Sequence, residues 1–386
     1  MALTTPQTNN KLIVFQKEIT REFFRENPFS PYMGEDITSI IRRLNDLKQG
    51  GEQINCPIVT RLTGTGKGVG TLTDNEEAID DYGMRAWIDW ARNAVATNKA
   101  SQQKDSADIF GEAKPLLSDW GKELQRDEII AAMMALPSES QPVGLGSDEG
   151  QRVNGILYED ATAAQRNTFN SDNSDRVLYG NALGNYVATH ATALQNVDTT
   201  NDTFVTASIN LLKYVAKQAK PRIRPFMVKQ TGARQYYVAF CGSNNFLQMS
   251  ASLQSIDIAA RARENAGMDD NPVYQDGDLL YKGVIIREVP EIDDFVTNIW
   301  TTLGTGGNAS SRVAPVFLCG QAAVAMPWGQ MPKPTFRETT DYQFIEGTGI
   351  EMAYGVSKYF KKHPKAGTKL VQLGIVTGFF SAANPA

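Results

Sequence analysis

The chain has 386 residues, with 38 Lys and Arg against 43 Asp and Glu and a formal net charge of −5, which excludes a chain-wide basic surface for gripping nucleic acid. Its hydrophobic share of 41% suffices to bury a core, and at ~150 residues per domain the length predicts two or three domains or one long elaborated unit. No apolar run approaches the ~18 residues that a membrane helix needs, and residues 1–10 are too polar for a signal peptide, so we expect neither a membrane span nor export by that route.

The first 50 residues predict an extended arm rather than a compact domain. Residues 9–25 carry apolar side chains at helical spacing, and a second amphipathic pattern over 37–47 ends at a Gly-Gly pair. Pro28 and Pro31 separate the two predicted helices. Their apolar stripes need a cover, and a neighbouring chain is one candidate.

Residues 51–97 predict a long β-hairpin with a projecting tip. Apolar and polar residues alternate over 54–62, where Pro57 confines the strand to the edge of a sheet, and the alternation resumes over 82–90. A glycine-rich tip followed by an acidic stretch lies between them, over 63–81. The glycines offer little to pack, so we expect the tip to project from the body.

The remainder of the chain mixes helices and strands and shows no internal repeat. The longest helical stripe spans 103–136, where Pro115 predicts either a kink or a helix start. Residues 137–176 are rich in Ser, Gly, Asn and Asp and predict a long surface loop. Beyond it we expect helices near 202–219, 251–266 and 321–326, and strands at 235–240, 279–289, 313–318, 350–356 and 370–377.

Residues that could carry chemistry are few and scattered. Cys56, Cys241 and Cys319 are far apart and form no CxxC pair, which predicts free thiols in a reducing compartment and no zinc site. His190 and His363 lack sequence neighbours that suggest a catalytic or metal-binding role, so a surface or hydrogen-bonded histidine is expected. The sequence therefore predicts no enzyme, no cofactor and no metal.

The glycine-rich tip does not form a nucleotide-binding motif. The phosphate-loop pattern requires Gly-Lys-Ser/Thr, and Gly66-Lys67 is followed here by Gly68. The acidic stretch, with Glu76 and Glu77, lacks the spacing of a calcium loop and predicts either a partner for arginines of an adjacent chain or a soluble edge.

The most basic stretch of the chain, residues 213–234, leaves three interpretations open. Its side chains, Arg222 and Arg224 among them, could contact packaged DNA, meet acidic patches across a subunit interface, or form a solvated surface. Trp87 and the other tryptophans predict core or interface anchors rather than a ligand cage.

Several segments together resemble a known family. Residues 22–36 read EFFRENPFSPYMGED, residues 58–72 read IVTRLTGTGKGVGTL and are followed by DNEEA at 74–78, and FLCGQAA at 317–323 precedes the predicted strand pair 341–360. This order is similar to that of tailed-bacteriophage major capsid proteins with the Hong Kong 97-type fold. The resemblance covers roughly residues 12–380.

The resemblance implies an α+β fold in which Pro115 departs from one straight spine helix. It divides the chain into an N-terminal arm (1–50), an extended β-hairpin loop (51–97), a peripheral domain with the spine helix and an inserted loop (98–199), an axial domain (200–335) and return strands of the peripheral domain (336–386).

The implied function is a major capsid protein that self-assembles into hexamers and pentamers of an icosahedral shell around double-stranded DNA. Scaffolding, portal and decoration proteins are expected partners, and the virion capsid, assembled in the host cytoplasm, is the expected location. The alternatives are an encapsulin-like nanocompartment shell and a cytosolic enzyme. An isopeptide crosslink from Lys67 to a neighbour's asparagine is a further hypothesis. The interface candidates are Phe23, Phe24, Lys67, Glu76, Glu77, Trp87, Arg222 and Arg224.

Overall fold

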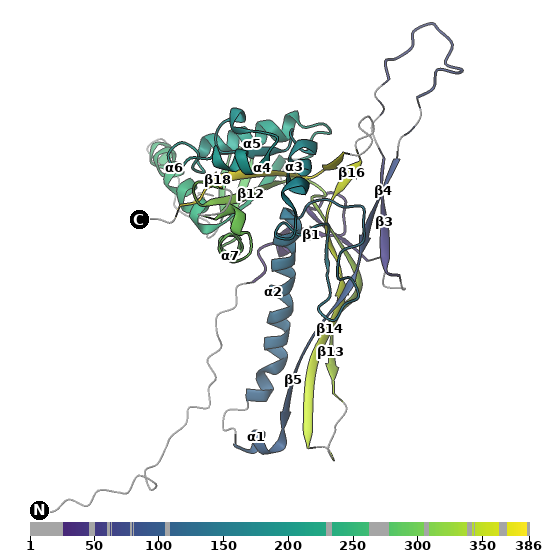
Figure 1. Cartoon of the computed structure of the whole chain (residues 1–386), viewed down its shortest axis with the longest axis vertical. Helices are drawn as coiled ribbons and strands as arrows, with labels where there is room; N and C mark the ends of the chain where they lie inside the picture. Colours follow the sequence, from purple (N-terminus) through teal and green to yellow (C-terminus); the bar gives the residue numbers. More distant parts are fainter. Residues whose placement is uncertain are drawn as a thin grey trace, which may run out of the picture. The chain divides into compact units, whose positions relative to one another are not determined.

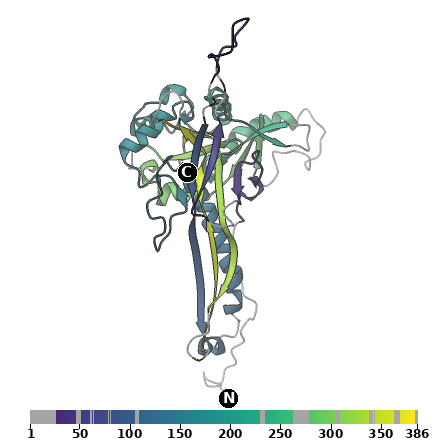
Figure 2. The ribbon, with the colours of Figure 1, turned by 90° about the vertical axis from the view of Figure 1, so that its right-hand side faces the viewer.

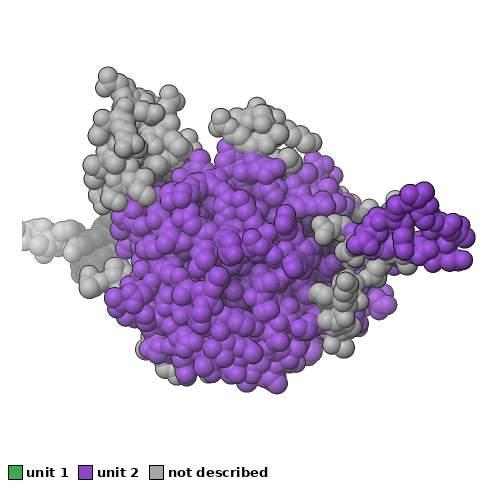
Figure 3. All heavy atoms as spheres, turned by 90° about the horizontal axis from the view of Figure 1, so that it is seen from above, with its two compact units in different colours: residues 1–27, 91–124, 332–352 green, residues 28–90, 125–331, 353–386 purple. Residues whose placement is uncertain are grey.

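The computed structural model divides the chain into two compact units. The first comprises residues 1–27, 91–124 and 332–352, and the second, purple in Figure 3, comprises residues 28–90, 125–331 and 353–386. The residues described are 26–45, 51–59, 62, 64–77, 79, 81–104, 109–228, 234–261, 278–304, 309–337, 342, 344–362 and 369–383. The helix predicted over 9–25, with Phe23 and Phe24, therefore lies outside the described residues, as does His363.

The first unit is a helix beside a narrow sheet (Figure 2). It holds α1 (Lys99–Lys104) and parts of α2 (Ala113–Met134), β5 (Asp89–Asn98), β13 (Val324–Phe336) and β14 (Ile345–Tyr354). Because α2 begins at Ala113, Pro115 lies in the first helical turn, where its missing N–H has no intrahelical partner to lose. The predicted helix start is confirmed.

Two prolines shape the outer edge of β13 in the first unit. The amide of Arg337 donates to the Gly347 carbonyl at 3.0 Å, which orients this end of the strand toward β14. Backbone N–H groups alternate in direction along a strand, so the ring nitrogens of Pro332 and Pro334, at odd separations from Arg337, point away from β14. These prolines remove two donors that would otherwise recruit another strand.

A six-stranded path forms the central sheet of the second unit, in the order β10-β11-β9-β12-β18-β7, with β8 beside β9. Its middle strands β12 and β18 are buried along their whole length, on both faces. The strands are β7 (Val177–Tyr179), β8 (Phe226–Val228), β9 (Arg234–Cys241), β10 (Asp278–Tyr281), β11 (Val284–Glu288), β12 (Val313–Cys319) and β18 (Ile375–Ser381).

Helices cover both faces of this sheet. Leu318 and Phe380 point to the face that packs against α5 and α6, whereas Tyr179 and Phe379 point to the face that carries His190. Figure 1 shows α5 and α7 on opposite sides of β12 and β18. The helices of this unit are α3 (Ala163–Asp172), α4 (His190–Gln195), α5 (Thr206–Gln218), α6 (Ser243–Arg261) and α7 (Glu291–Asn298).

Smaller strand groups complete the fold. One sheet runs in the order β1-β2-β13-β14-β5, with β15 beside β13 and β6 beside β15, and two separate hairpins pair β3 with β4 and β16 with β17. Their bounds are β1 (Met33–Gly34), β2 (Ile41–Leu44), β3 (Gln53–Val59), β4 (Asp81–Trp87), β6 (Val153–Asn154), β15 (Val356–Lys358), β16 (Phe360–Lys362) and β17 (Leu370–Gln372). No helix in the described part of the chain is both long and apolar enough for a membrane span.

Three predicted elements are wrong. Residues 41–44 form β2 instead of a helix, because Ile41 pairs in parallel with both Met33 and Val324. The helix expected at 321–326 is replaced by the start of β13, whose first residues are buried on both faces. The loop expected over 137–176 contains α3, whose Thr162 forms a capping box with Gln165. The helix expected at 251–266 begins earlier, at Ser243.

A substitution at Gly355, between β14 and β15, tests how closely this residue packs against the backbone of Trp87. A Cβ atom at position 355 would lie 2.0 Å from the carbonyl oxygen of Trp87, so Gly355→Ala must shift backbone. We expect it to destabilise the subunit by about 1–3 kcal/mol, as overpacking does. Gly66→Ala is the matched control, because a Cβ at Gly66 meets no atom within 4 Å. Equal thermal unfolding midpoints for the two variants would contradict the packing.

Candidate assembly surfaces

The extended hairpin of β3 and β4 rests on the body of the second unit through one face. Its register pairs Gln53 with Trp87 and Val59 with Asp81. Met84 and Cys56 are buried on this face, in a cluster that includes Phe360. Among the described strands β3 pairs only with β4, so the edge position predicted from Pro57 is confirmed.

Beyond these strands, the hairpin continues into a loop (Figure 1), and the large apolar side chains described in this loop are exposed. Val69 is fully exposed and Leu72 is 67% exposed. A monomeric protein rarely keeps so many large apolar side chains of one segment in water, so this loop is a candidate for contact with another chain. Its exposed apolar residues are Val59, Leu62, Val69, Leu72 and Ile79.

The three polar candidates of the loop, Lys67, Glu76 and Glu77, are all exposed, and Glu77 also makes a hydrogen bond within the loop. The Glu77 carboxylate accepts a hydrogen bond from the Gly64 amide at 2.6 Å and so joins the two sides of the loop. Lys67 and Glu76 are exposed, and Gly66 and Gly68 have open space around them. Sequence reasoning located the loop but did not single out Val69, Leu72 and Ile79, which carry no strand or helix period.

Trp87 is placed inside the subunit. Its ring is 7% exposed, and its backbone exchanges two hydrogen bonds with the Asn154 amide, at 2.8 and 2.9 Å. Most of its surface is thus already covered by this chain. Arg222 and Arg224 are exposed and follow α5 in an irregular segment, whose position is fixed by the Gln321 amide donating to the Arg224 carbonyl at 2.8 Å.

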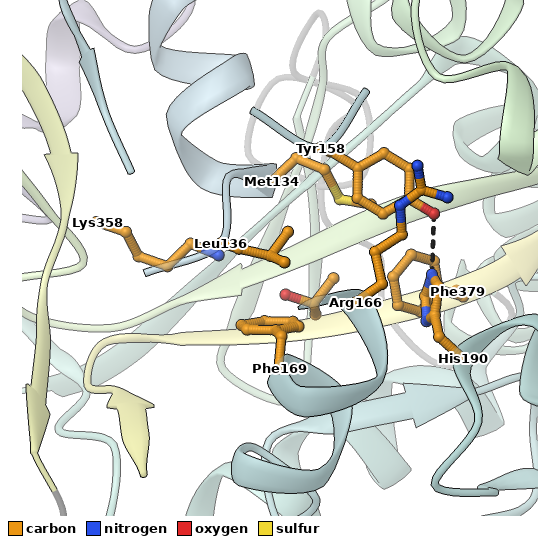
Figure 4. A pocket seen from close by; sticks show the side chains of 9 residues that line it. Met134, Leu136, Tyr158, Arg166, Phe169, His190, Lys358 and Phe379 are labelled. Atoms are coloured by element: carbon orange, nitrogen blue, oxygen red, sulfur yellow. Dashed lines mark hydrogen bonds between the residues drawn. The ribbon is translucent and has the colours of Figure 1, made fainter. Parts of the chain in front are cut away.

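His190 is held in a chain of hydrogen bonds that assigns each partner one role. Tyr179 Oη donates to Asn170 Oδ1 at 3.0 Å and is therefore free only to accept from His190 Nδ1, at 2.6 Å. His190 Nε2 then accepts from Tyr158 Oη at 2.9 Å, drawn as the dashed line in Figure 4, and Tyr158 accepts from Thr302. Burial, with a smaller effect of Arg166, lowers the pKa of His190 to about 4, so the ring is neutral and fully engaged.

This arrangement predicts an acid-sensitive contribution of His190 to stability. Its pKa is about 4 in the folded chain against 6.5 for an unperturbed histidine, so the unfolded chain binds the proton first. The folded state should lose up to about 3 kcal/mol from this residue as pH falls from 6.5 to 4. The stability difference between the wild type and His190→Phe should shrink over that window, and a constant difference would contradict the assignment.

Lys358 lines the same small cavity as His190, from the opposite side (Figure 4). Its ammonium group donates to Gln372 Oε1 at 3.1 Å and lies 5.1 Å from the centre of the Phe169 ring. No ion pair among the described residues neutralises it, and burial lowers its pKa to about 7. The cavity measures about 10 Å³, at the lower limit of what one water needs, so it has no room for a substrate.

The described residues hold no group of three or more His, Cys, Asp or Glu that could bind a metal. The three cysteines are free and buried, as the sequence predicts. Burial raises the pKa of the thiols of Cys241 and Cys319, which disfavours the reactive thiolate. Among the described residues, the hairpin loop is a segment that carries several exposed apolar side chains.

Comparisons with known proteins find similarity to phage capsid proteins. A family model described as phage capsid protein matches residues 8–377. The capsid asymmetric unit of cyanophage Pam1 is similar over 100% of both chains, with 30% identity and a TM-score of 0.85. No curated protein has a sequence that matches this one.

Two further solved structures share the fold at low identity. The capsid of Ralstonia phage GP4 is similar over 100% of both chains, with 16% identity and a TM-score of 0.69. The head of Helicobacter pylori bacteriophage KHP40 covers 97% of this chain and 96% of its own, with 14% identity and a TM-score of 0.62.

Proposed function

The chain belongs to the phage capsid protein family and is a major capsid protein of an icosahedral shell, and from this premise we propose that its shell is built from hexamers and pentamers and encloses double-stranded DNA. Non-specific contact with that DNA, and partnership with scaffolding, portal and decoration proteins, are part of the proposal. The location is the virion capsid, with assembly in the host cytoplasm.

The observation that carries the proposal is the exposed apolar loop of the hairpin. In the described part of the chain Val69 and Leu72 are largely exposed, and a shell supplies neighbours that can cover them in every subunit. Interfaces of obligate assemblies often exceed ~2,000 Å² and are more apolar than transient ones. A loop that is exposed alone and buried on assembly gives the shell stability through mass action.

The proposed fold assignment is the Hong Kong 97-type capsid fold. In it, residues 1–50 serve as the N-terminal arm and 51–97 as the extended loop over a neighbour. Residues 200–335 form the axial domain at the centre of each capsomer. Residues 98–199, with α2 as spine helix, and the return strands 336–386 form the peripheral domain. The pairing of β3 with β4 and the length of α2 support this assignment.

The residues proposed for contacts between copies follow from exposure. Lys67 and Glu76 lie on the exposed loop, Glu77 shapes that loop, and Arg222 and Arg224 lie on an exposed basic segment. Phe23 and Phe24 belong to the proposed arm, outside the described residues. Trp87 supports the hairpin from within the subunit.

Electron microscopy of assembled particles tests the proposal. We expect closed shells with both five-fold and six-fold rings, and nuclease-protected double-stranded DNA inside particles from an infected host. Shells that hold a protein cargo and no nucleic acid would instead support a nanocompartment. Absence of five-fold rings in closed particles would contradict the proposed capsomers.

A further inference from the structure

Three lysines from two distant segments meet on one face of the second unit. Lys213 and Lys217 lie one turn apart on α5, and the ammonium group of Lys213 donates a hydrogen bond to the carbonyl of Lys282, in the turn between β10 and β11. Lys282 and Lys217 are exposed. Sequence analysis found the first two as part of a basic stretch, and only the fold adds Lys282.

The positive charge of this lysine cluster is not compensated by described acidic side chains, so an anionic partner would stabilise it. Burial and then the charges of Lys217 and Lys282 lower the pKa of Lys213, so the three groups repel one another in the isolated chain. Lys282 also holds a left-handed backbone with φ of 46°, a conformation that favours Gly or Asn. No ion pair in the described part of the chain involves any of the three lysines.

Exposed acidic side chains lie on two neighbouring elements of the same unit, α7 and the loop before α3. Asp294 lies exposed in the first turn of α7, and Glu159 and Asp160 lie exposed in the loop before α3. The Tyr158 ring contacts the Trp300 ring, with centroids 6.2 Å apart, which brings this loop next to the end of α7. Burial and then the charge of Asp160 raise the pKa of Glu159, so these carboxylates also repel one another.

The two charged surfaces lie on opposite faces of the central sheet. Phe380 points into the core under α5, and its neighbour in the strand, Phe379, points to the His190 and Tyr158 side. Tyr158 and Trp300 place α7 and the acidic loop on that second side. Figure 1 shows α5 and α7 separated by β12 and β18.

A ring of identical subunits brings opposite faces together. In a cyclic assembly each copy presents one surface to the preceding neighbour and a different surface to the following one. We propose that the basic face of Lys213, Lys217 and Lys282 docks against the acidic face of Asp294, Glu159 and Asp160 of the next copy in the capsomer ring. This inference rests on the proposed function, and it names a second copy of this chain as the occupant of both faces.

The proposed contact reduces the repulsion between like charges on each face. Like charges within one face raise the free energy of the isolated subunit, and complementary charges across the interface remove that repulsion. Such complementarity also excludes face-to-face docking of two basic or two acidic surfaces, so it selects the head-to-tail order that a closed ring needs.

A charge-swap experiment on the full-length chain tests the pairing. Lys217→Glu and Asp294→Lys alone should each slow shell formation at least about tenfold, measured by light scattering at matched concentrations, because each places like charges across the interface. The double variant should recover most of the rate. Lys217→Arg and Asp294→Glu keep the charges and should assemble as the wild type does.

The outcomes separate this inference from the proposed function. A wild-type chain that never forms rings would overturn the proposed function itself. Normal assembly of both single variants, or a double variant as slow as either single one, would overturn the pairing while leaving the shell intact. Normal assembly of Lys217→Glu with loss of retained DNA would also overturn it, and would assign the basic face to nucleic acid.

Discussion

Replacing Val69 and Leu72 together by Asp should abolish shell formation and leave the subunit folded. Both side chains are exposed in the isolated chain, so the change removes no internal packing. In the shell, however, a neighbour would have to bury two unpaired carboxylates at every subunit, which costs several kcal/mol per contact. Because the same contact repeats throughout the shell, the loss is expected to be complete.

Sedimentation measures whether shells form, and circular dichroism measures whether the subunit remains folded. The variant should remain a small species with an unchanged helical spectrum at concentrations where the wild type forms shells. The control, Val69→Ile with Leu72→Met, keeps the loop apolar and should assemble normally. Normal shells from the double Asp variant would show that the loop apex is not an assembly contact.

Lys358→Met should make the subunit more stable at neutral pH. The wild-type ammonium group is buried without a described acidic partner, and its pKa is about 7 in the folded chain against 10.5 for an unperturbed lysine. The protonated folded state therefore carries a penalty of up to about 5 kcal/mol. Met fills a similar volume but leaves Gln372 Oε1 without its donor, which costs ~1–3 kcal/mol. A net gain of up to about 2–4 kcal/mol follows.

The pH profile identifies the cause of that gain. Below pH 7 both the folded and unfolded wild type bind the Lys358 proton, so the penalty is complete and constant. Between pH 7 and 10.5 only the unfolded chain binds it, so wild-type stability should rise with pH and the advantage of Met should vanish. Lys333→Met, at an exposed strand position, is the matched control. Denaturant unfolding of unassembled full-length subunits provides the measurement, and a pH-independent gain would contradict the burial of a charged group.

Sequence reasoning was most successful where local signals and tertiary environment agree. The β3–β4 hairpin shows period-two alternation and a glycine-rich turn region, and α5 carries one apolar stripe whose residues Ile209, Leu212 and Val215 are all buried. Pro115 marked the start of α2 because proline is accepted in the first turn of a helix.

Sequence reasoning failed where pairing with distant strands decides the conformation. Ile40 and Ile41 fit a helical stripe, yet both are fully buried, and Ile41 begins the strand β2, which pairs with β13 almost 300 residues away. The Ala-rich run before Pro327 favours a helix by propensity, but its burial on both faces makes it the start of β13. No local window contains those partners.

Some features of the candidate surfaces can be predicted from the sequence, and others depend on the fold. The loop, its lysine and its acidic residues can be located from composition, since glycine and charge are visible in the sequence. The hydrogen bond from Lys213 to the Lys282 carbonyl and the burial of Lys358 depend on contacts between distant segments, which the sequence does not show. Exposure of Val69 and Leu72 is also a property of the fold, because apolar residues in a sequence are expected to be covered.

Electron cryomicroscopy of the full-length chain after concentration determines whether this chain builds a shell through its exposed hairpin. We expect closed shells in which Val69 and Leu72 lie against another copy. A uniform small species that persists at high concentration, in crowding agents and across salt concentrations, or shells in which the loop remains in solvent, would contradict it.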